Sequence, residues 1–224
     1  MHRSFLAKYR SNVNSQNGED GILREMLRRL NITSGYVCEF GACNGTFLSN
    51  TFNLVRRGFK AVLIEVDEVA FTGLEALSKT YPKITPICAC VDHNPQSETS
   101  LDNLLAKTDI PYDFDVLSID IDSFDYQVWD SLKNYMPKIV VIEINSSIDF
   151  SVPDHIHTPG IFEGTGFLPM MKLAKQKGYE FVVHTGNMVF IRRDLYPILQ
   201  LGEDSTEKPQ PTDLILRNGR FVYI

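Results

Sequence analysis

The chain has 224 residues, of which 22 are lysine or arginine and 28 are aspartate or glutamate, so its formal net charge is −6. Apolar residues make up 43% and charged residues 22%, which is typical of a globular protein and excludes a disordered one. At roughly 150 residues per domain, this length indicates one large domain or a tight pair, and we expect a single domain over 1–224. The acidic balance argues against nucleic acid as a partner, because binding its phosphates needs clustered lysine and arginine.

No apolar run approaches the ~18 residues of a membrane span. Met1–Arg10 also lacks the apolar core and cleavage site of a signal peptide. The four cysteines, Cys38, Cys43, Cys88 and Cys90, have C-x4-C and C-x-C spacings, not the C-x-x-C pairs of zinc ribbons. We therefore expect small buried thiols and a cytoplasmic, reducing location.

Apolar runs alternate with helical patterns, which predicts a parallel sheet with helices on its faces. The first helix is expected over 18–30, where apolar residues recur at helical spacing. The elements expected next are strands 36–40, 60–65, 84–91, 114–120 and 138–144, and helices 47–57, 69–80, 99–107 and 126–135. Pro86 should place its strand at an edge of the sheet or break it, because proline cannot donate to the ladder.

The alternation stops after the fifth expected strand. Residues 145–166 form a long irregular segment, and such segments in compact domains tend to be lids or binding loops. A helix over 168–178 and a hairpin over 179–192 are expected to follow, with a second hairpin around Asn218-Gly219. The result is a doubly wound α/β sheet, in which ligands bind at the carboxyl ends of the strands.

The first two strand ends favour an adenosine ligand. Glu39-Phe-Gly41-Ala-Cys-Asn-Gly45 is a small-residue turn that allows a ligand close to the backbone. It lacks the glycine patterns that bind pyrophosphate. Glu65, 24 residues after Gly41, can accept hydrogen bonds from both ribose hydroxyls, and Val91 would flank an adenine. Taken singly, the turn and the acid are equally consistent with a strand-to-helix turn and a solvated carboxylate.

Polar side chains also end the fourth and fifth strands. Asp120 and Asp122 would lie on one side if the fourth strand continues to that point, and Glu143 and Asn145 share a face of the fifth. Converging carboxylates need a cation or a donor between them. These residues therefore predict either a hard-cation site or a polar substrate site. Asp125 is expected to cap the following helix.

The ordered set of motifs resembles the S-adenosylmethionine-dependent methyltransferases, and within them the FkbM-like group, which modifies hydroxyls on sugars and natural products. The motifs are Ser15-Gln16-Asn-Gly-Glu-Asp20, Glu39-x-Gly41-x-x-x-Gly45, Glu65, Ile119-Asp120-x-Asp122 and Ile142-Glu143. The resemblance covers about 15–193. The motif at the end of the fourth strand differs from the group's usual I-D-x-E-G, since this chain has Asp122 and Ser123 at the last two positions.

The resemblance implies a Rossmann-like methyltransferase sheet of seven strands, mostly parallel, with an antiparallel C-terminal hairpin. It also implies a cofactor half over 36–125, an acceptor-side loop over 145–166 and S-adenosylmethionine as the cofactor. The implied contacts are Gly41, Asn44 and Gly45 to the methionine part, Glu65 to the ribose, Val91 to the adenine and Asp120 to the amino or sulfonium end, with Gln16 and Glu39 completing the set.

Methyl transfer to an alkyl hydroxyl depends on alignment and gains ~10²–10⁴-fold from a general base. The expected bases are Asp122, His155 and His157. A divalent cation such as Mg²⁺ could instead deprotonate the acceptor. Its expected ligands are Asp120, Asp122, Glu143 and Asn145.

The predicted function is O-methylation of a small polar acceptor, such as a sugar or glycan. Three other functions remain open: a D-x-D glycosyltransferase that binds metal at Asp120 and Asp122, a nicotinamide dehydrogenase, and a non-catalytic module that binds an adenosyl ligand. The sequence does not predict an oligomeric state.

Overall fold

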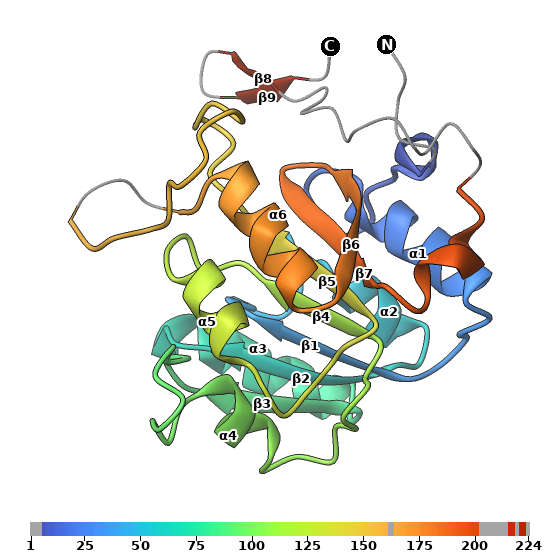
Figure 1. Cartoon of the computed structure of the whole chain (residues 1–224). Helices are drawn as coiled ribbons and strands as arrows, with labels where there is room; N and C mark the ends of the chain where they lie inside the picture. The colour runs from blue at the N-terminus through green and yellow to red at the C-terminus, as the bar shows by residue number, and fades with distance from the viewer. Residues whose placement is uncertain (1–5, 161–163, 202–214, 218–219, 223–224) are drawn as a thin grey trace.

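The computed structural model describes residues 6–160, 164–201, 215–217 and 220–222. Its centre is a seven-stranded sheet with the order β3-β2-β1-β4-β5-β7-β6 (Figure 1). The strands are β1 Tyr36–Phe40, β2 Lys60–Glu65, β3 Ile84–Cys88, β4 Val116–Ile119, β5 Ile139–Glu143, β6 Tyr179–His184 and β7 Asn187–Arg192. The first five strands pair in parallel, and β7 is antiparallel to both neighbours. The predicted doubly wound sheet with a C-terminal hairpin is confirmed.

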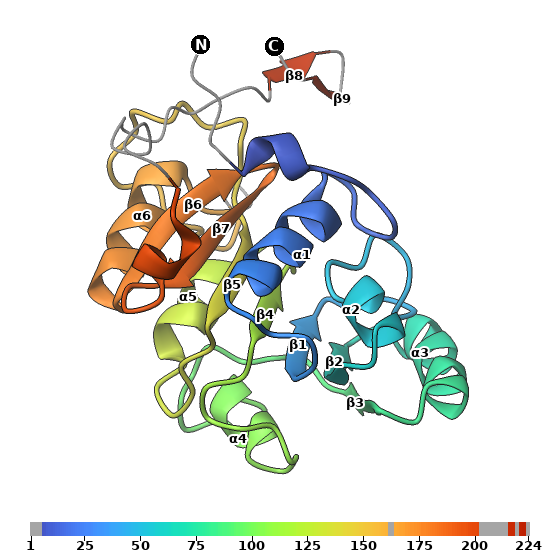
Figure 2. The same ribbon diagram turned by 90° about the vertical axis from the view of Figure 1, so that its right-hand side faces the viewer.

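Helices cover both faces of the sheet (Figure 2). They are α1 Glu19–Arg29, α2 Phe52–Arg56, α3 Glu68–Thr80, α4 Leu101–Leu105, α5 Asp125–Ser131 and α6 Phe167–Gln176, with 3-10 turns η1 Ala7–Tyr9 and η2 Tyr196–Leu199. Ile22, Leu54 and Leu74 pack α1, α2 and α3 into one apolar core, and Trp129 and Met170 pack α5 and α6 into the other. Alternate residues of each strand supply the two cores, because side chains of a strand point to opposite faces.

The predicted helix over 47–57 is wrong in its first half, because α2 begins only at Phe52. The Asn44 Oδ1 atom accepts the amide N–H groups of Thr46 and Phe47, which ties the chain into a turn. Leu48 then has a φ of +53°, which no helix tolerates. A free helix N-terminus therefore does not follow the glycine turn.

β3 is the edge strand that Pro86 predicts, and it ends at Cys88 instead of residue 91. The expectation of buried thiols is confirmed for Cys38 but wrong for Cys88 and Cys90, which are exposed free thiols. Their exposure follows from their place at the end of an edge strand.

The second predicted hairpin matches β8 Ile215–Arg217 and β9 Arg220–Val222, which pair antiparallel; its turn, 218–219, lies outside the described residues. Within the described part of the chain, no helix combines the length and the apolar character needed to cross a membrane.

Candidate functional site

The loop after β1 lies directly against the loop after β4. Gly41 has a φ of +73°, and a β-carbon there would lie 1.8 Å from the carbonyl oxygen of Asp120. Gly45 has a φ of +80° and faces Leu74 and Leu77 of α3. Both glycines are therefore required for the packing of the chain itself. Of the two glycines, Gly41 is exposed and Gly45 is buried.

Glu39 is buried in β1, and its carboxylate holds the chain that follows the glycine turn. It accepts hydrogen bonds from Ser49 Oγ and Thr51 Oγ1, both at 2.6 Å, and from the Asn50 amide N–H at 2.8 Å. Burial nevertheless raises the pKa of Glu39. The predicted cofactor contact of Glu39 thus competes with three internal partners. The sequence contains a signal for them, since a buried acid needs donors and a Ser-Asn-Thr triplet follows ten residues later.

Glu65 joins the ends of β1 and β2. Its Oε2 atom accepts the Cys43 amide N–H at 2.6 Å, and Oε1 accepts those of Val66 and Asp67 at 2.8 Å. Among the described residues, the Cys43 amide is the one donor to Oε2. This oxygen can therefore accept a further hydrogen bond from a ribose hydroxyl. The predicted neighbour of the adenine, Val91, packs at the edge of the core beneath α4 and α5. These residues fit an adenosyl ligand.

The N-terminal segment lies over the loop after β1. Ser15 forms a bridge with Leu48, and Asn14 Nδ2 donates to the Thr46 carbonyl at 3.3 Å. The Gln16 side chain is exposed, and Asn44 is engaged in its own turn. The motif is therefore close to the predicted site, whereas the structure leaves the cofactor contacts of Gln16 and Asn44 as predictions.

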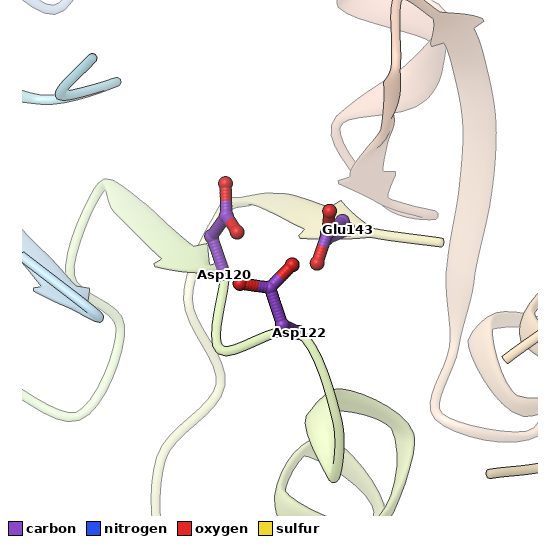
Figure 3. A group of neighbouring side chains, drawn as sticks. All are labelled: Asp120, Asp122 and Glu143. Atoms are coloured by element: carbon purple, nitrogen blue, oxygen red, sulfur yellow. The ribbon is translucent and has the colours of Figure 1, made fainter. Parts of the chain in front are cut away.

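Three carboxylates meet at the ends of β4 and β5 (Figure 3). One oxygen each of Asp120, Asp122 and Glu143 lies within 4.8 Å of the others. The predicted convergence is confirmed, but not by strand alternation. β4 ends at Ile119, and Asp122 has a φ of +58°, so a turn directs its carboxylate back toward the other two.

The crowding of these acids changes their protonation. Burial raises the pKa of Asp120, and the negative charges of Asp125, Asp122 and Glu39 raise it further. Burial and the charge of Asp120 likewise raise the pKa of Glu143, which hydrogen bonds with Asp120. The pair therefore shares a proton at neutral pH, or releases it when a positive charge binds.

The predicted capping role of Asp125 is wrong. Asp125 is the first residue of α5, and Phe124 holds the cap position without a side-chain hydrogen bond. Its carboxylate reaches back to the amide N–H groups of Ile121 and Ser123, at 2.9 and 3.0 Å. It thus fixes the turn that carries Asp122.

The acceptor-side loop contributes less to the acid cluster than expected. The Asn145 Oδ1 atom accepts from the amide and the hydroxyl of Ser147, at 3.0 and 2.5 Å. His155 is partly buried. His157 is 8% exposed, its Nδ1 accepts the Gly164 amide N–H at 3.2 Å, and its ring contacts Phe124 edge-on. His157 is therefore a packing residue of the loop in this arrangement.

Sequence reasoning missed a hydrogen-bonded pair at the same edge, formed by the half-buried Ser146 and the buried His184. Ser146 Oγ lies 3.0 Å from Nε2 of His184, the last residue of β6. Burial, together with the nearby charge of Arg10, lowers the pKa of His184 to about 4. No sequence pattern signals this pair, because β7 lies between β5 and β6 and only the fold brings the two residues together.

No protein-family model matches the sequence, and no curated protein matches it. Among solved structures, the CurJ carbon methyltransferase superposes with a TM-score of 0.51 at 10% identity, covering 83% of this chain and 56% of that one. This chain therefore shares its overall fold with that methyltransferase. The N-terminal domain of EvdMO1 with SAH bound has a TM-score of 0.48 at 12% identity, covering 79% and 80%. An S-adenosylmethionine-dependent methyltransferase from Clostridium acetobutylicum ATCC 824 has a TM-score of 0.47 at 12% identity, and the match covers 81% of this chain and 93% of that one.

Proposed function

We propose that this protein is an S-adenosylmethionine-dependent O-methyltransferase that acts on a hydroxyl of a small polar acceptor, most simply a sugar or glycan, as the FkbM-like resemblance implies. The observation that carries the proposal is the hydrogen bond from the Cys43 amide to Glu65, which joins the glycine turn to the acid that ends β2. This pairing supports an adenosyl ligand, because the acid lies beside a turn whose backbone is exposed at Gly41.

Bound S-adenosylmethionine would supply an activated methyl group. Glu65 would hold the ribose, and the exposed Gly41 would adjoin the methionine part. Asp120 and Glu143 would face the positively charged end, since a sulfonium or ammonium group relieves the repulsion that raises their pKa values. The half-buried site would keep water from the reacting atoms, which favours transfer to the acceptor over hydrolysis.

Three residues are proposed as the base that removes the acceptor's proton. Asp122 has the strongest support, because its side chain is exposed and lies in the carboxylate group at the strand ends. His155 and His157 lie on the acceptor-side loop. His157 would first have to leave its contact with Phe124.

A divalent cation is a second candidate for this step. Asp120, Asp122 and Glu143 present oxygen ligands within 4.8 Å of one another, which is the ligand chemistry that Mg²⁺ prefers. The cation would bind the acceptor hydroxyl and favour its ionisation. Loss of methyl transfer in EDTA, restored by Mg²⁺, would support the cation; undiminished transfer in EDTA would exclude it.

A thermal-shift screen tests the proposed cofactor against the competing functions. S-adenosylmethionine, S-adenosylhomocysteine, a uridine-diphosphate sugar with Mn²⁺, and NAD⁺ are added separately. The first two should raise the melting temperature. Stabilisation by the nucleotide sugar alone would indicate a glycosyltransferase, and by NAD⁺ alone a dehydrogenase.

Mass spectrometry tests the reaction. Glycans and metabolites are incubated with the protein and S-adenosylmethionine and searched for products heavier by one methylene. A protein that binds the cofactor but yields no such product from any extract would be a non-catalytic binding module instead.

A further inference from the structure

Three aromatic rings form a column at the carboxyl edge of the sheet. The imidazole of His93, from the loop between β3 and α4, stacks on Phe124 with ring centres 4.8 Å apart and an interplanar angle of 6°. Among the described residues, a second aromatic neighbour of Phe124 is His157, whose ring lies 4.7 Å away at an angle of 77°. The rings come from three segments, so they are brought together only by the fold.

Phe124 is the fixed member of the column. It packs on the same apolar core as Val91 and Ile121, which follow β3 and β4. His157 restricts its rotation, because the His157 ring is buried, accepts a hydrogen bond at Nδ1 and contacts Phe124 at 77°. These contacts with the core and with His157 fix the orientation of the Phe124 ring. The ring face toward His93 is therefore a flat stacking surface, called the platform below.

His93 is the exposed member. Its side chain is 48% exposed, and within the described part of the chain its ring contacts are Phe124 and Asp92, whose Oδ1 lies 3.8 Å away. The loop around it does not depend on this side chain. Its base is closed by the bridge between Asp92 and Ser100, and Asn94 bonds through its backbone to Asp92 Oδ1. Rotation of the His93 side chain alone would therefore uncover the platform.

The uncovered phenyl face is a surface on which a purine base can stack. Phe124 packs on the same core as Val91, which follows the end of β3 at Cys88. Since β3 pairs with β2, which ends in Glu65, a nucleoside with its ribose at Glu65 would extend its base in this direction. Stacking of a nucleobase on an aromatic side chain contributes more than stacking of the smaller imidazole. The exchange of one ring for the other is thus favourable.

We propose that His93 occupies, in the ligand-free protein, the stacking position on Phe124 that the adenine takes when the adenosyl ligand binds. The inference rests on the proposed cofactor and adds to it a residue that competes with the ligand. His93 lowers the affinity for the cofactor and keeps the apolar ring of Phe124 covered in its absence.

Calorimetric titration with S-adenosylhomocysteine and with 5′-methylthioadenosine tests this proposal. His93→Ala should bind both ligands roughly two- to tenfold more tightly than wild type, because the stack no longer has to break. Gln96→Ala, an exposed substitution in the same loop, should match wild type and is the control. Equal or weaker binding by His93→Ala overturns the proposal, and weaker binding would indicate that the adenine rests on His93 itself.

A second measurement does not depend on affinity. The Hε1 proton of His93, assigned by its loss in His93→Ala, should resonate upfield in the free protein because it lies over the Phe124 ring. Saturation with S-adenosylhomocysteine should move it to its ordinary position. An unmoved resonance in a protein that binds the ligand overturns the proposal. Failure of wild type and His93→Ala alike to bind either ligand would instead reject the proposed cofactor.

Discussion

The carbonyl oxygen of Asp120 occupies the space beside Gly41 in which any other residue would have its side chain. The glycine turn that indicates a ligand is therefore also the point at which β1 and β4 come together. Gly41 is needed there for two reasons: its φ is positive, and its α-carbon lies in close contact with the backbone of Asp120.

Gly41→Ala should destabilise the fold and displace the end of β4. The positive φ alone costs on the order of 1–3 kcal/mol in a non-glycine residue, and the clash with the Asp120 carbonyl adds to it. Urea denaturation measures the loss. Gly160 also has a positive φ, and no atom of the described residues would lie within 4 Å of a β-carbon there, so Gly160→Ala separates the contact from the backbone strain. Equal losses in the two variants would contradict the importance of the contact.

Glu39→Ala should lower the free energy of unfolding by about 3 kcal/mol, because it leaves buried donors of Ser49, Asn50 and Thr51 without their acceptor. Glu98→Ala, at an exposed position, is the control. A loss of cofactor affinity without a loss of stability would mean that Glu39 binds the ligand rather than the loop.

Glu65→Gln should weaken S-adenosylhomocysteine binding at least tenfold. A glutamine amide nitrogen cannot accept hydrogen bonds, so the side chain can no longer accept on both sides. Either the bond from Cys43 or the bonds from Val66 and Asp67 are lost, together with an acceptor for the ribose. Calorimetry measures the affinity. Glu68→Gln, at an exposed site in the first turn of α3, should bind like wild type.

The stability of the protein should fall in acid because of His184. Its pKa is lowered from 6.5 to about 4 in the folded state, so the unfolded chain binds the proton more readily. The contribution is complete above pH 6.5 and is lost as the pH falls toward 4, by about 3 kcal/mol in total. Denaturation of wild type and His184→Gln at pH 7 and pH 4.5 measures it. The variant should lose less stability between the two values, and an unchanged difference would refute the assignment.

Asp122→Asn should reduce the rate of methyl transfer about 10²-fold or more while cofactor affinity stays near that of wild type, if Asp122 is the base. His155→Ala and His157→Ala are compared in the same assay, with the acceptor found by mass spectrometry. A rate that falls only in a histidine variant would transfer the role to the acceptor-side loop.

The sequence predicts the order of elements and the strand ends because these depend on local periodicity and on parallel connections. It predicts the meeting of Asp120 and Glu143 for the same reason, whereas Asp122 joins them through a turn after β4 that strand alternation does not predict. It fails where side chains override local preference. Asn44 ends the glycine turn with its own hydrogen bonds, so the helix expected at residue 47 begins at Phe52.

Contacts between distant segments are the other part that the sequence does not predict. The stacking of His93 on Phe124 and the pairing of Ser146 with His184 join residues 31 and 38 positions apart. Neither pair has a motif or a spacing, because each depends on which strands become neighbours in the sheet. Burial of His157 against Phe124 is of the same kind.

The N-terminal segment is hydrogen bonded to the end of β6 and the turn that follows it. Thr185 Oγ1 donates to Glu19 at 2.6 Å, and the Arg10 guanidinium donates to the His184 carbonyl at 2.7 Å, across 166 and 174 residues. During synthesis the N-terminus emerges first, so the hydrogen bond between Thr185 and Glu19 can form only after nearly all of the sheet has left the ribosome. The N-terminal segment that carries the Ser15–Asp20 motif is thus fixed to the sheet only at the end of synthesis. A nascent chain stalled before β6 would contain the motif residues but lack these contacts.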